Sequence, residues 1–309
     1  MRAAVIDVGS NSIKLLVADR APGGLREVLS TTLEVRIGTG IGSGTPSLSE
    51  DGMARGLSAI AELYAAALKE GAGRFMAVAT SAVRDAANGA AFRERVQAAT
   101  GLELRILSGT EEADGIGRGL TTDPALSGLR NFQVYDLGGG SLECLDFRDR
   151  RVSSAVSLPI GCVRLTEMFV RAPQGPLEPE DLAAMTRHVT ETLLSSGFPL
   201  PAAEGTAFVG TGGTVTTARA ILAAKVGLKL ADSDPRVPVA SLREMLALIG
   251  PVDVASRKTV PGLPASRADV FPTALATLLV VAGLSGAQSF QHSFRNLRWG
   301  LAAQLLDQA

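Results

Sequence analysis

The sequence contains few cysteines and histidines, the residues that cross-link small domains through disulfides or bind metals through sulfur and imidazole. Among 309 residues there are 2 cysteines and 2 histidines. Cys144 and Cys162 lie in dissimilar contexts and form no C-x-x-C pair, so neither a disulfide framework nor a thiolate metal site is expected. His188 and His292 show no metal-ligand spacing and accompany no nucleophile, which argues against a histidine-dependent mechanism. We therefore expect a reducing, cytoplasmic location.

Excess charge and long apolar runs are also missing. The 30 basic and 31 acidic residues give a net charge of -1, so an anionic ligand must be held locally rather than by a global field. Residues 1–7 contain no signal-peptide pattern. The most apolar stretch, residues 271–287, is interrupted by polar residues and is too short to cross about 30 Å of bilayer. It predicts a buried core helix, and neither nucleic acid nor a membrane is an expected partner.

The length of the chain and the alternation of its elements indicate a two-domain α/β protein. At roughly 150 residues per domain, the length favours two domains. Apolar runs at 2–6 and 15–18 predict a hairpin, helices are expected at 53–68 and 90–100, and strands at 75–80 and 102–107. A polar, turn-rich segment at 121–129 predicts the domain boundary, followed by a strand at 132–136. Later helices are expected at 182–193, 215–224, 242–249 and 297–306.

Three glycine-rich turns follow predicted strands, and the first two repeat one pattern of strand, Asp, turn and strand. Glycine lets several backbone N–H groups converge on one anion, and hydroxyl groups add further donors. None is a P-loop, because no Gly-Lys-Ser/Thr occurs, and any one alone is more often only a tight turn. Together they favour phosphate binding by Asp7, Gly9, Ser10, Asn11, Gly138, Gly139, Gly140, Ser141, Thr211, Gly212, Gly213 and Thr214.

Carboxylates stand at the first two turns. Asp7 and Asp136 lie where a phosphate-bridging cation needs oxygen ligands, and Mg²⁺ takes one or two carboxylates together with water and phosphate. Glu143 follows Ser141 by two residues, so the strand period directs it toward the same space as Asp136. The alternatives are that each Asp only caps its own turn and that Glu143 is solvated.

Further charged residues follow predicted strands. Glu111 and Glu112 are adjacent at the start of a helix, so at most one of them can point into a given cleft and orient a water. Arg84 can fork onto phosphate oxygens, or form a surface salt bridge with Asp85 or Glu94. Lys14, Arg164, Arg219 and Arg267 are further candidate anion contacts, most of them expected to be solvated.

Seven motifs stand in a fixed order along nearly the whole chain. They are residues 6–12 (IDVGSNS), 79–86 (ATSAVRDA), 108–113 (SGTEEA), 135–143 (YDLGGGSLE), 161–167 (GCVRLTE), 210–214 (GTGGT), and 261–264 (PGLP) with 267–269 (RAD). In this order they resemble the exopolyphosphatase / guanosine pentaphosphate phosphohydrolase (Ppx/GppA) family. The ordered set is far more specific than any one motif.

The resemblance implies an α/β architecture of two ribonuclease-H-like domains, the actin-like ATPase fold, with the site in the cleft between them. The domains would be residues 1–124, joined by the last helix at about 297–309, and residues 125–296. The implied reaction is removal of terminal phosphate from polyphosphate, or of the 5′ phosphate from guanosine pentaphosphate, with Mg²⁺ or another divalent cation. By the family pattern Glu112 is the catalytic base, Asp136 and Glu143 position metal and water, and Arg84 is an ancillary phosphate contact. A homodimer is also expected from the family.

The sequence departs from the family pattern at several positions. Lys14 stands where many members have His, Leu142 replaces the usual Thr, and residues 292–298 follow the last motif only loosely. The end of the chain just after the core predicts the short form, without the C-terminal helical domain of long members. Two alternatives stay open, a non-catalytic sensor of guanosine polyphosphates and a kinase of the same fold, because fold alone does not decide function.

Overall fold

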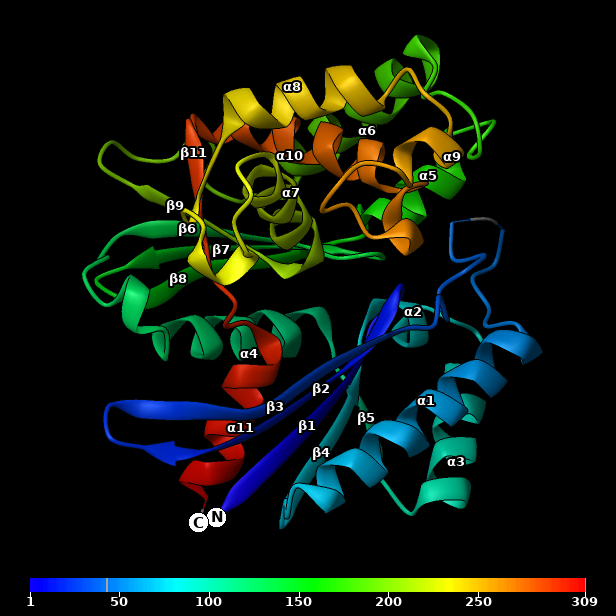
Figure 1. Ribbon diagram of the computed structural model, residues 1–309, viewed down its shortest axis with the longest axis vertical. Coiled ribbons are helices and arrows are strands. Elements are labelled where there is room, and N and C mark those ends of the chain that lie inside the picture. Colours follow the sequence, from blue (N-terminus) through cyan, green and yellow to red (C-terminus); the bar gives the residue numbers. More distant parts are fainter. Residues whose placement is uncertain (43, 309) are drawn as a thin grey trace. The chain divides into compact units, whose positions relative to one another are not determined.

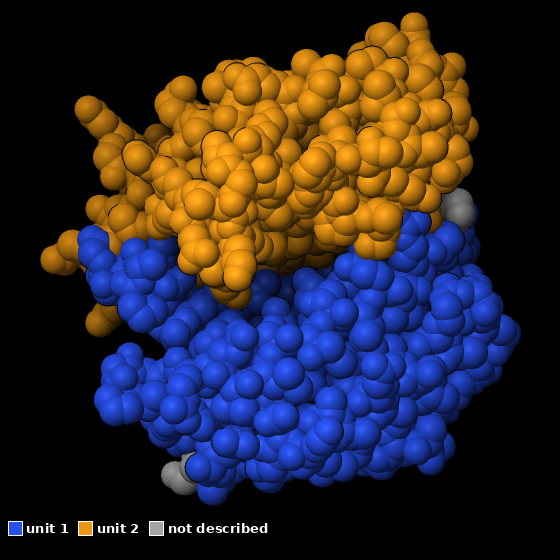
Figure 2. Space-filling view, viewed as in Figure 1, with its two compact units in different colours: residues 1–128, 295–309 blue, residues 129–294 orange. Residues whose placement is uncertain are grey.

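The computed structural model describes residues 1–42 and 44–308, and the chain divides into two compact units. Unit 1 consists of residues 1–128 and 295–309, and unit 2 of residues 129–294 (Figure 1, Figure 2). Each unit combines a mixed β-sheet with α-helices. The α/β class predicted from the sequence is therefore confirmed.

Unit 1 is built on a sheet with the strand order β3-β2-β1-β4-β5. The pairs β1–β2 and β2–β3 are antiparallel, whereas β1, β4 and β5 run parallel. The strands are β1 (Arg2–Val8), β2 (Ser12–Ala21), β3 (Gly24–Glu34), β4 (Arg74–Ala79) and β5 (Leu104–Ile106). The helices are α1 (Glu50–Lys69), α2 (Ser81–Arg84), α3 (Gly89–Thr100), α4 (Gly109–Thr121) and α11 (Leu297–Asp307), with a 3-10 turn at Pro124–Leu126. Helix α11 packs against α4 and β1.

Unit 2 is built on a sheet with the strand order β10-β11-β9-β6-β7-β8. The strands are β6 (Phe132–Leu137), β7 (Leu142–Arg148), β8 (Arg151–Leu158), β9 (Ala207–Thr211), β10 (Arg236–Pro238) and β11 (Ser289–His292). The helices are α5 (Cys162–Phe169), α6 (Pro179–Ser195), α7 (Gly212–Lys225), α8 (Val239–Ile249), α9 (Val254–Arg257) and α10 (Phe271–Ser285), with 3-10 turns at Leu230–Asp232 and Ala265–Arg267. The core lies between this sheet and its helices.

The two sheets repeat each other. The order β8-β7-β6-β9-β11 reproduces β3-β2-β1-β4-β5, which is the ribonuclease-H-like order. The pairing register also shifts at equivalent places, between Val17 and Ala18 in β2 and between Asp146 and Phe147 in β7. Val17 precedes Asp146 by the same number of residues as Asp7 precedes Asp136. The predicted internal repeat is confirmed, and it extends to β3 and β8, which the sequence patterns leave unassigned.

Helix α10 is the predicted core helix. It is buried along most of its length against α5, α6 and α8. Pro272 stands in its first turn, where a missing N–H costs nothing, and Gly286 ends it in the left-handed conformation. None of the helices in the described part of the chain combines the length and apolarity that a membrane span requires.

Candidate functional site

The first glycine turn lies at the carboxyl end of β1, beside the carboxyl ends of the parallel strands β4 and β5. The Gly9 N–H donates to the Ser12 carbonyl at 3.1 Å and closes the turn. The hydroxyl oxygens of Ser10, in the turn, and Ser81, at the start of α2, are buried and lie 3.2 Å apart. Open α/β sheets bind ligands at the carboxyl ends of their strands. This edge is the candidate site of unit 1.

Asp7 brings an unused carboxylate oxygen to this edge. Its Oδ1 is buried and has no hydrogen-bond partner among the residues that the structure describes. Burial raises the pKa of Asp7, while the positive charges of Lys14 and Arg298 oppose the rise. Because buried polar atoms in proteins are nearly always satisfied, an unsatisfied oxygen here fits a residue that contacts a ligand, its cation or its water, rather than one that caps its own turn.

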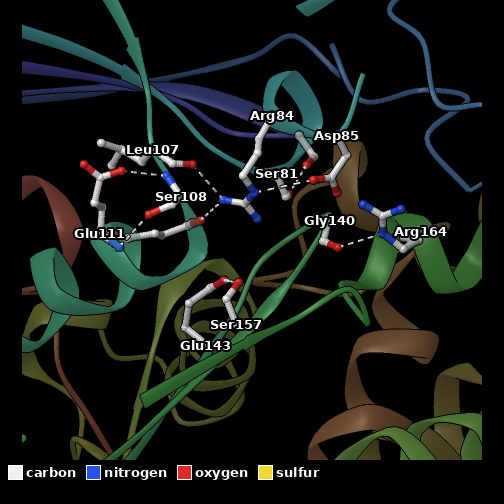
Figure 3. A network of polar contacts seen from close by, with 12 residues as sticks. Ser81, Arg84, Asp85, Leu107, Ser108, Glu111, Gly140, Glu143, Ser157 and Arg164 are labelled. Carbon is white, nitrogen blue, oxygen red and sulfur yellow. Dashed lines mark hydrogen bonds and ion pairs between the residues drawn. The ribbon is translucent and has the colours of Figure 1, made fainter. Parts of the chain in front are cut away.

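The start of α4 separates the roles of two adjacent glutamates. Ser108 and Glu111 form a reciprocal capping box, in which the Ser108 N–H donates to Glu111 at 2.8 Å and the Glu111 N–H donates to Ser108 Oγ at 3.2 Å (Figure 3). The hydrogen bond from the Ser108 backbone, together with one from Arg105, lowers the pKa of Glu111 to about 2. Glu112 is instead buried, with 6% of its surface exposed. Glu111 thus caps the helix, whereas Glu112 lies buried beside it.

Arg84 links α2 to Glu112. Its Nη1 donates to Glu112 Oε2 at 2.8 Å and to the Leu107 carbonyl at 3.2 Å (Figure 3 shows the contact with Leu107). The alternative salt bridge with Asp85 is also present, with 3.4 Å between Arg84 Nε and Asp85 Oδ1. A cation and a buried carboxylate therefore stand side by side at the end of β5, a pairing that suits phosphate binding and proton transfer.

The second glycine turn joins β6 to β7 and closes like the first, because the Gly138 N–H donates to the Ser141 carbonyl at 3.0 Å. Asp136 and Glu143 are opposite each other in the β6–β7 register, and both are buried. The Ser157 hydroxyl of β8 donates to Glu143 Oε1 at 2.7 Å (Figure 3). The alternative of a solvated Glu143 is therefore wrong, since packing and Ser157 fix its carboxylate.

The two equivalent turns differ in charge. Lys14 holds in β2 the place that Glu143 holds in β7, opposite an Asp in each case. The second turn therefore has two carboxyl groups opposite each other, while Asp7 has a cation as its neighbour. The described residues contain no group of three or more His, Cys, Asp or Glu that could hold a metal. A donor set of two carboxylates still fits Mg²⁺, because this ion keeps several waters and binds substrate phosphates.

The third turn connects β9 to α7. Thr211 faces Asp136 in the parallel β6–β9 register, and its buried hydroxyl has no partner within residues 1–42 and 44–308. Gly212 has a φ of 80°, and a side chain there would overlap the Asp136 carboxylate, so glycine is required. Helix α7 starts without a side-chain cap in this described segment. Its N-terminal N–H groups and dipole favour an anion at this position.

Three of the four further candidate anion contacts are buried. Arg164, Arg219 and Arg267 expose less than a tenth of their surface, so the prediction that most of the four are solvated is wrong. Arg267 lies against Gly213, with its Nη2 3.4 Å from the Thr214 hydroxyl. Arg219 donates to Ser233 and His292, which assigns it a role in holding unit 2 together.

The repeated strand order, with glycine turns and carboxylates at the strand ends, defines an α/β protein of the actin-like ATPase fold. The model of the Ppx/GppA phosphatase family matches residues 16–309. Exopolyphosphatase 2 of Mycobacterium tuberculosis is 32% identical over 279 residues, covering 87% of this chain and 86% of that protein. Exopolyphosphatase 1 of Mycobacterium bovis is 31% identical over 303 residues, covering 94% and 83%. The crystal structure of the Aquifex aeolicus member of the Ppx/GppA family has a TM-score of 0.78 at 25% identity, covering 100% of this chain and 98% of that one.

This chain belongs to the Ppx/GppA phosphatase family. The resemblance drawn from the seven motifs is confirmed, and with it the fold that the resemblance implies.

Proposed function

We propose that this protein is an exopolyphosphatase, a hydrolase that removes the terminal phosphate of inorganic polyphosphate. The observation that carries the proposal is the contact between Glu112 and Arg84, 2.8 Å apart at the end of β5. It joins a carboxylate that can accept a proton from water to a cation that can bind the attacked phosphoryl group. The names of the mycobacterial relatives support polyphosphate as the substrate class.

In this proposal the chain supplies position and charge. The N–H groups of the glycine turns bind phosphate oxygens, and Asp7 faces the bound phosphate. Glu112 orients a water in line with the terminal phosphorus and accepts its proton. Arg84 forks onto the phosphoryl oxygens as negative charge develops on them. Asp136 and Glu143 would hold Mg²⁺ or another divalent cation, which neutralises phosphoryl charge when bound.

The same chemistry suits a second substrate. Guanosine pentaphosphate ends in a 5′ phosphoanhydride like that of polyphosphate, and the family resemblance includes its hydrolysis. We therefore place it beside polyphosphate in the test. A homodimer stays an expectation from the family resemblance, and a cytoplasmic location stays an expectation from the low cysteine content.

The test measures phosphate release from short polyphosphate, long polyphosphate and guanosine pentaphosphate with Mg²⁺, using wild type, Glu112→Gln and Glu111→Gln. Glu112→Gln should lower kcat by about 10²–10⁴-fold, the usual contribution of a general base. Glu111→Gln is the matched control, because Gln preserves a capping box, and it should keep near-wild-type kcat. Full activity of Glu112→Gln would contradict the assignment. Nucleotide binding without turnover would indicate a sensor, and phosphate transfer to an acceptor would indicate a kinase.

A further inference from the structure

The start of helix α5 holds the second glycine turn from one side. The Gly138 carbonyl accepts the N–H of Cys162 at 3.0 Å, and the Gly139 carbonyl accepts those of Val163 at 2.8 Å and Arg164 at 3.1 Å. The Gly140 carbonyl accepts Nε–H of Arg164 at 3.0 Å (Figure 3). The N–H groups at the start of α5 therefore donate to carbonyls of the second glycine turn, not to a ligand.

These bonds determine where the N–H groups of the turn point. A trans peptide is planar, with its C=O and N–H directed to opposite sides. Holding the carbonyls of residues 138, 139 and 140 toward α5 therefore directs the N–H groups of Gly139, Gly140 and Ser141 away from it. In the described part of the chain, the N–H groups of Gly139 and Gly140 donate to no backbone acceptor. The turn is thereby set up as a cradle of donors for an anion.

The first turn is held in a corresponding way. The Ser10 carbonyl accepts the Gly38 N–H at 2.9 Å, and the Asn11 carbonyl accepts the N–H groups of Val35 at 3.2 Å and Arg36 at 2.9 Å. In both units the donors come from the segment that follows the third strand. The recurrence shows that holding the turn carbonyls is part of the repeated architecture.

Close approach of the backbone makes this clamp possible. A side chain at Gly161 would overlap the backbone of Gly139 and Gly140, so only glycine lets α5 start at this distance. The second turn adds one element, a bond from a side chain. Arg164 is 8% exposed, and its Nε–H donates to the Gly140 carbonyl. The backbone N–H groups at the start of α5 donate to the carbonyls of Gly138 and Gly139 instead.

We propose that Arg164 is a positioning residue for phosphate binding. Its Nε–H fixes the Gly140–Ser141 peptide so that the Ser141 N–H faces the phosphate. The inference rests on the proposed function and deepens it. Arg164 does not contact the phosphate in this proposal; it aligns the Ser141 N–H, which does. If Arg164 acted instead through its charge on the substrate, Arg164→Gln and Arg164→Met would lower kcat equally.

A matched pair of variants isolates this bond. Gln places Nε2 the same number of bonds from Cα as Nε of Arg, whereas Met places a methyl group there, and both lack the charge. We expect Arg164→Met to have a kcat for polyphosphate about tenfold below that of Arg164→Gln, the effect of one net hydrogen bond. Rates are normalised to folded protein by circular dichroism. Equal normalised kcat values for the two variants, whether near wild type or equally reduced, would overturn the inference.

A binding measurement separates failure of this inference from failure of the proposed function. If the wild type binds tripolyphosphate with Mg²⁺ in calorimetry but releases no phosphate, the hydrolase proposal fails and the inference is decided by affinity. Arg164→Met should then bind tripolyphosphate about tenfold more weakly than Arg164→Gln. Equal affinities, or a wild type that neither binds nor hydrolyses, would overturn the positioning role.

Discussion

Acidification should destabilise the protein through His292, a buried histidine of unit 2. Its Nδ1 lies 3.2 Å from Arg219 Nη1 and its Nε2 3.0 Å from the Thr216 hydroxyl. Since a guanidinium can only donate, Nδ1 must accept and the ring proton resides on Nε2. The Thr216 hydroxyl in turn donates to the Gly212 carbonyl at 2.7 Å. A neutral His292 therefore supports the third glycine turn, and a second ring proton would disrupt the contact with Arg219.

The size of the effect follows from the pKa. Burial first, and then the charge of Arg219, lower the pKa of His292 from 6.5 to about 4. Between these pH values the unfolded chain binds more protons at this residue than the folded chain, so stability rises with pH across the window. The difference corresponds to about 3 kcal/mol of unfolding free energy. It is present in full above about pH 6.5 and is lost progressively as the pH falls toward about 4.

Urea unfolding followed by circular dichroism at pH 7 and pH 4.5 measures this contribution. The wild type should lose about 2 kcal/mol more unfolding free energy between the two pH values than His292→Gln, which has no titrating ring. His188→Gln is the control, because His188 is only partly buried and its ring contacts Phe169. This control should follow the wild type. Identical pH dependence of the wild type and His292→Gln would refute the reasoning.

Two glycine substitutions test close contacts elsewhere. Gly212→Ala should lower kcat about a hundredfold, because its methyl group displaces the Asp136 carboxylate. Gly205→Ala has a similar φ of 76° but open space around it, and should retain kcat. Equal kcat values for the two variants would contradict the overlap with Asp136. Gly300→Ala should lower the unfolding free energy by about 1–3 kcal/mol, because its methyl group overlaps the backbone of α4. Gly283→Ala, in open space on α10, should raise the unfolding free energy by up to about 1 kcal/mol. Unchanged urea midpoints for Gly300→Ala and Gly283→Ala would contradict the close packing of Gly300 on α4.

The sequence predicts the elements whose residues are buried on a regular period. The hairpin of β1 and β2, the helix α1 and the apolar helix α10 all follow from such patterns, and α3 ends at the predicted Gly101. The strands β3 and β8 were missed because they lie at sheet edges, where most of their residues are partly or fully exposed. An edge strand has one neighbour and little buried surface, so its pattern is weak.

The candidate site is predictable as residue types at strand ends, but not as contacts. Spacing cannot distinguish Glu111 from Glu112. The structure places Glu111 in a capping box, which the sequence Ser108-Gly-Thr-Glu111 already contained as a signal, and buries Glu112. The bonds from Ser157 to Glu143 and from Arg164 to Gly140 join residues 14 and 24 positions apart. Such contacts depend on the pairing of β7 with β8 and on where α5 starts, which periodicity does not determine.

If the proposed function holds, the repeated turns explain how a chain with a net charge of -1 can bind a polyanion. Lysines placed beside Asp136 and Glu143 would pair with these carboxylates and compete with a divalent cation. Backbone N–H groups offer directed partial charges that add no net charge. Under the proposed function, a cradle of backbone donors would bind phosphate in the same unit whose two carboxylates would hold the cation. In the first turn Lys14 stands where Glu143 stands in the second, which agrees with the proposal that the divalent cation is held in unit 2.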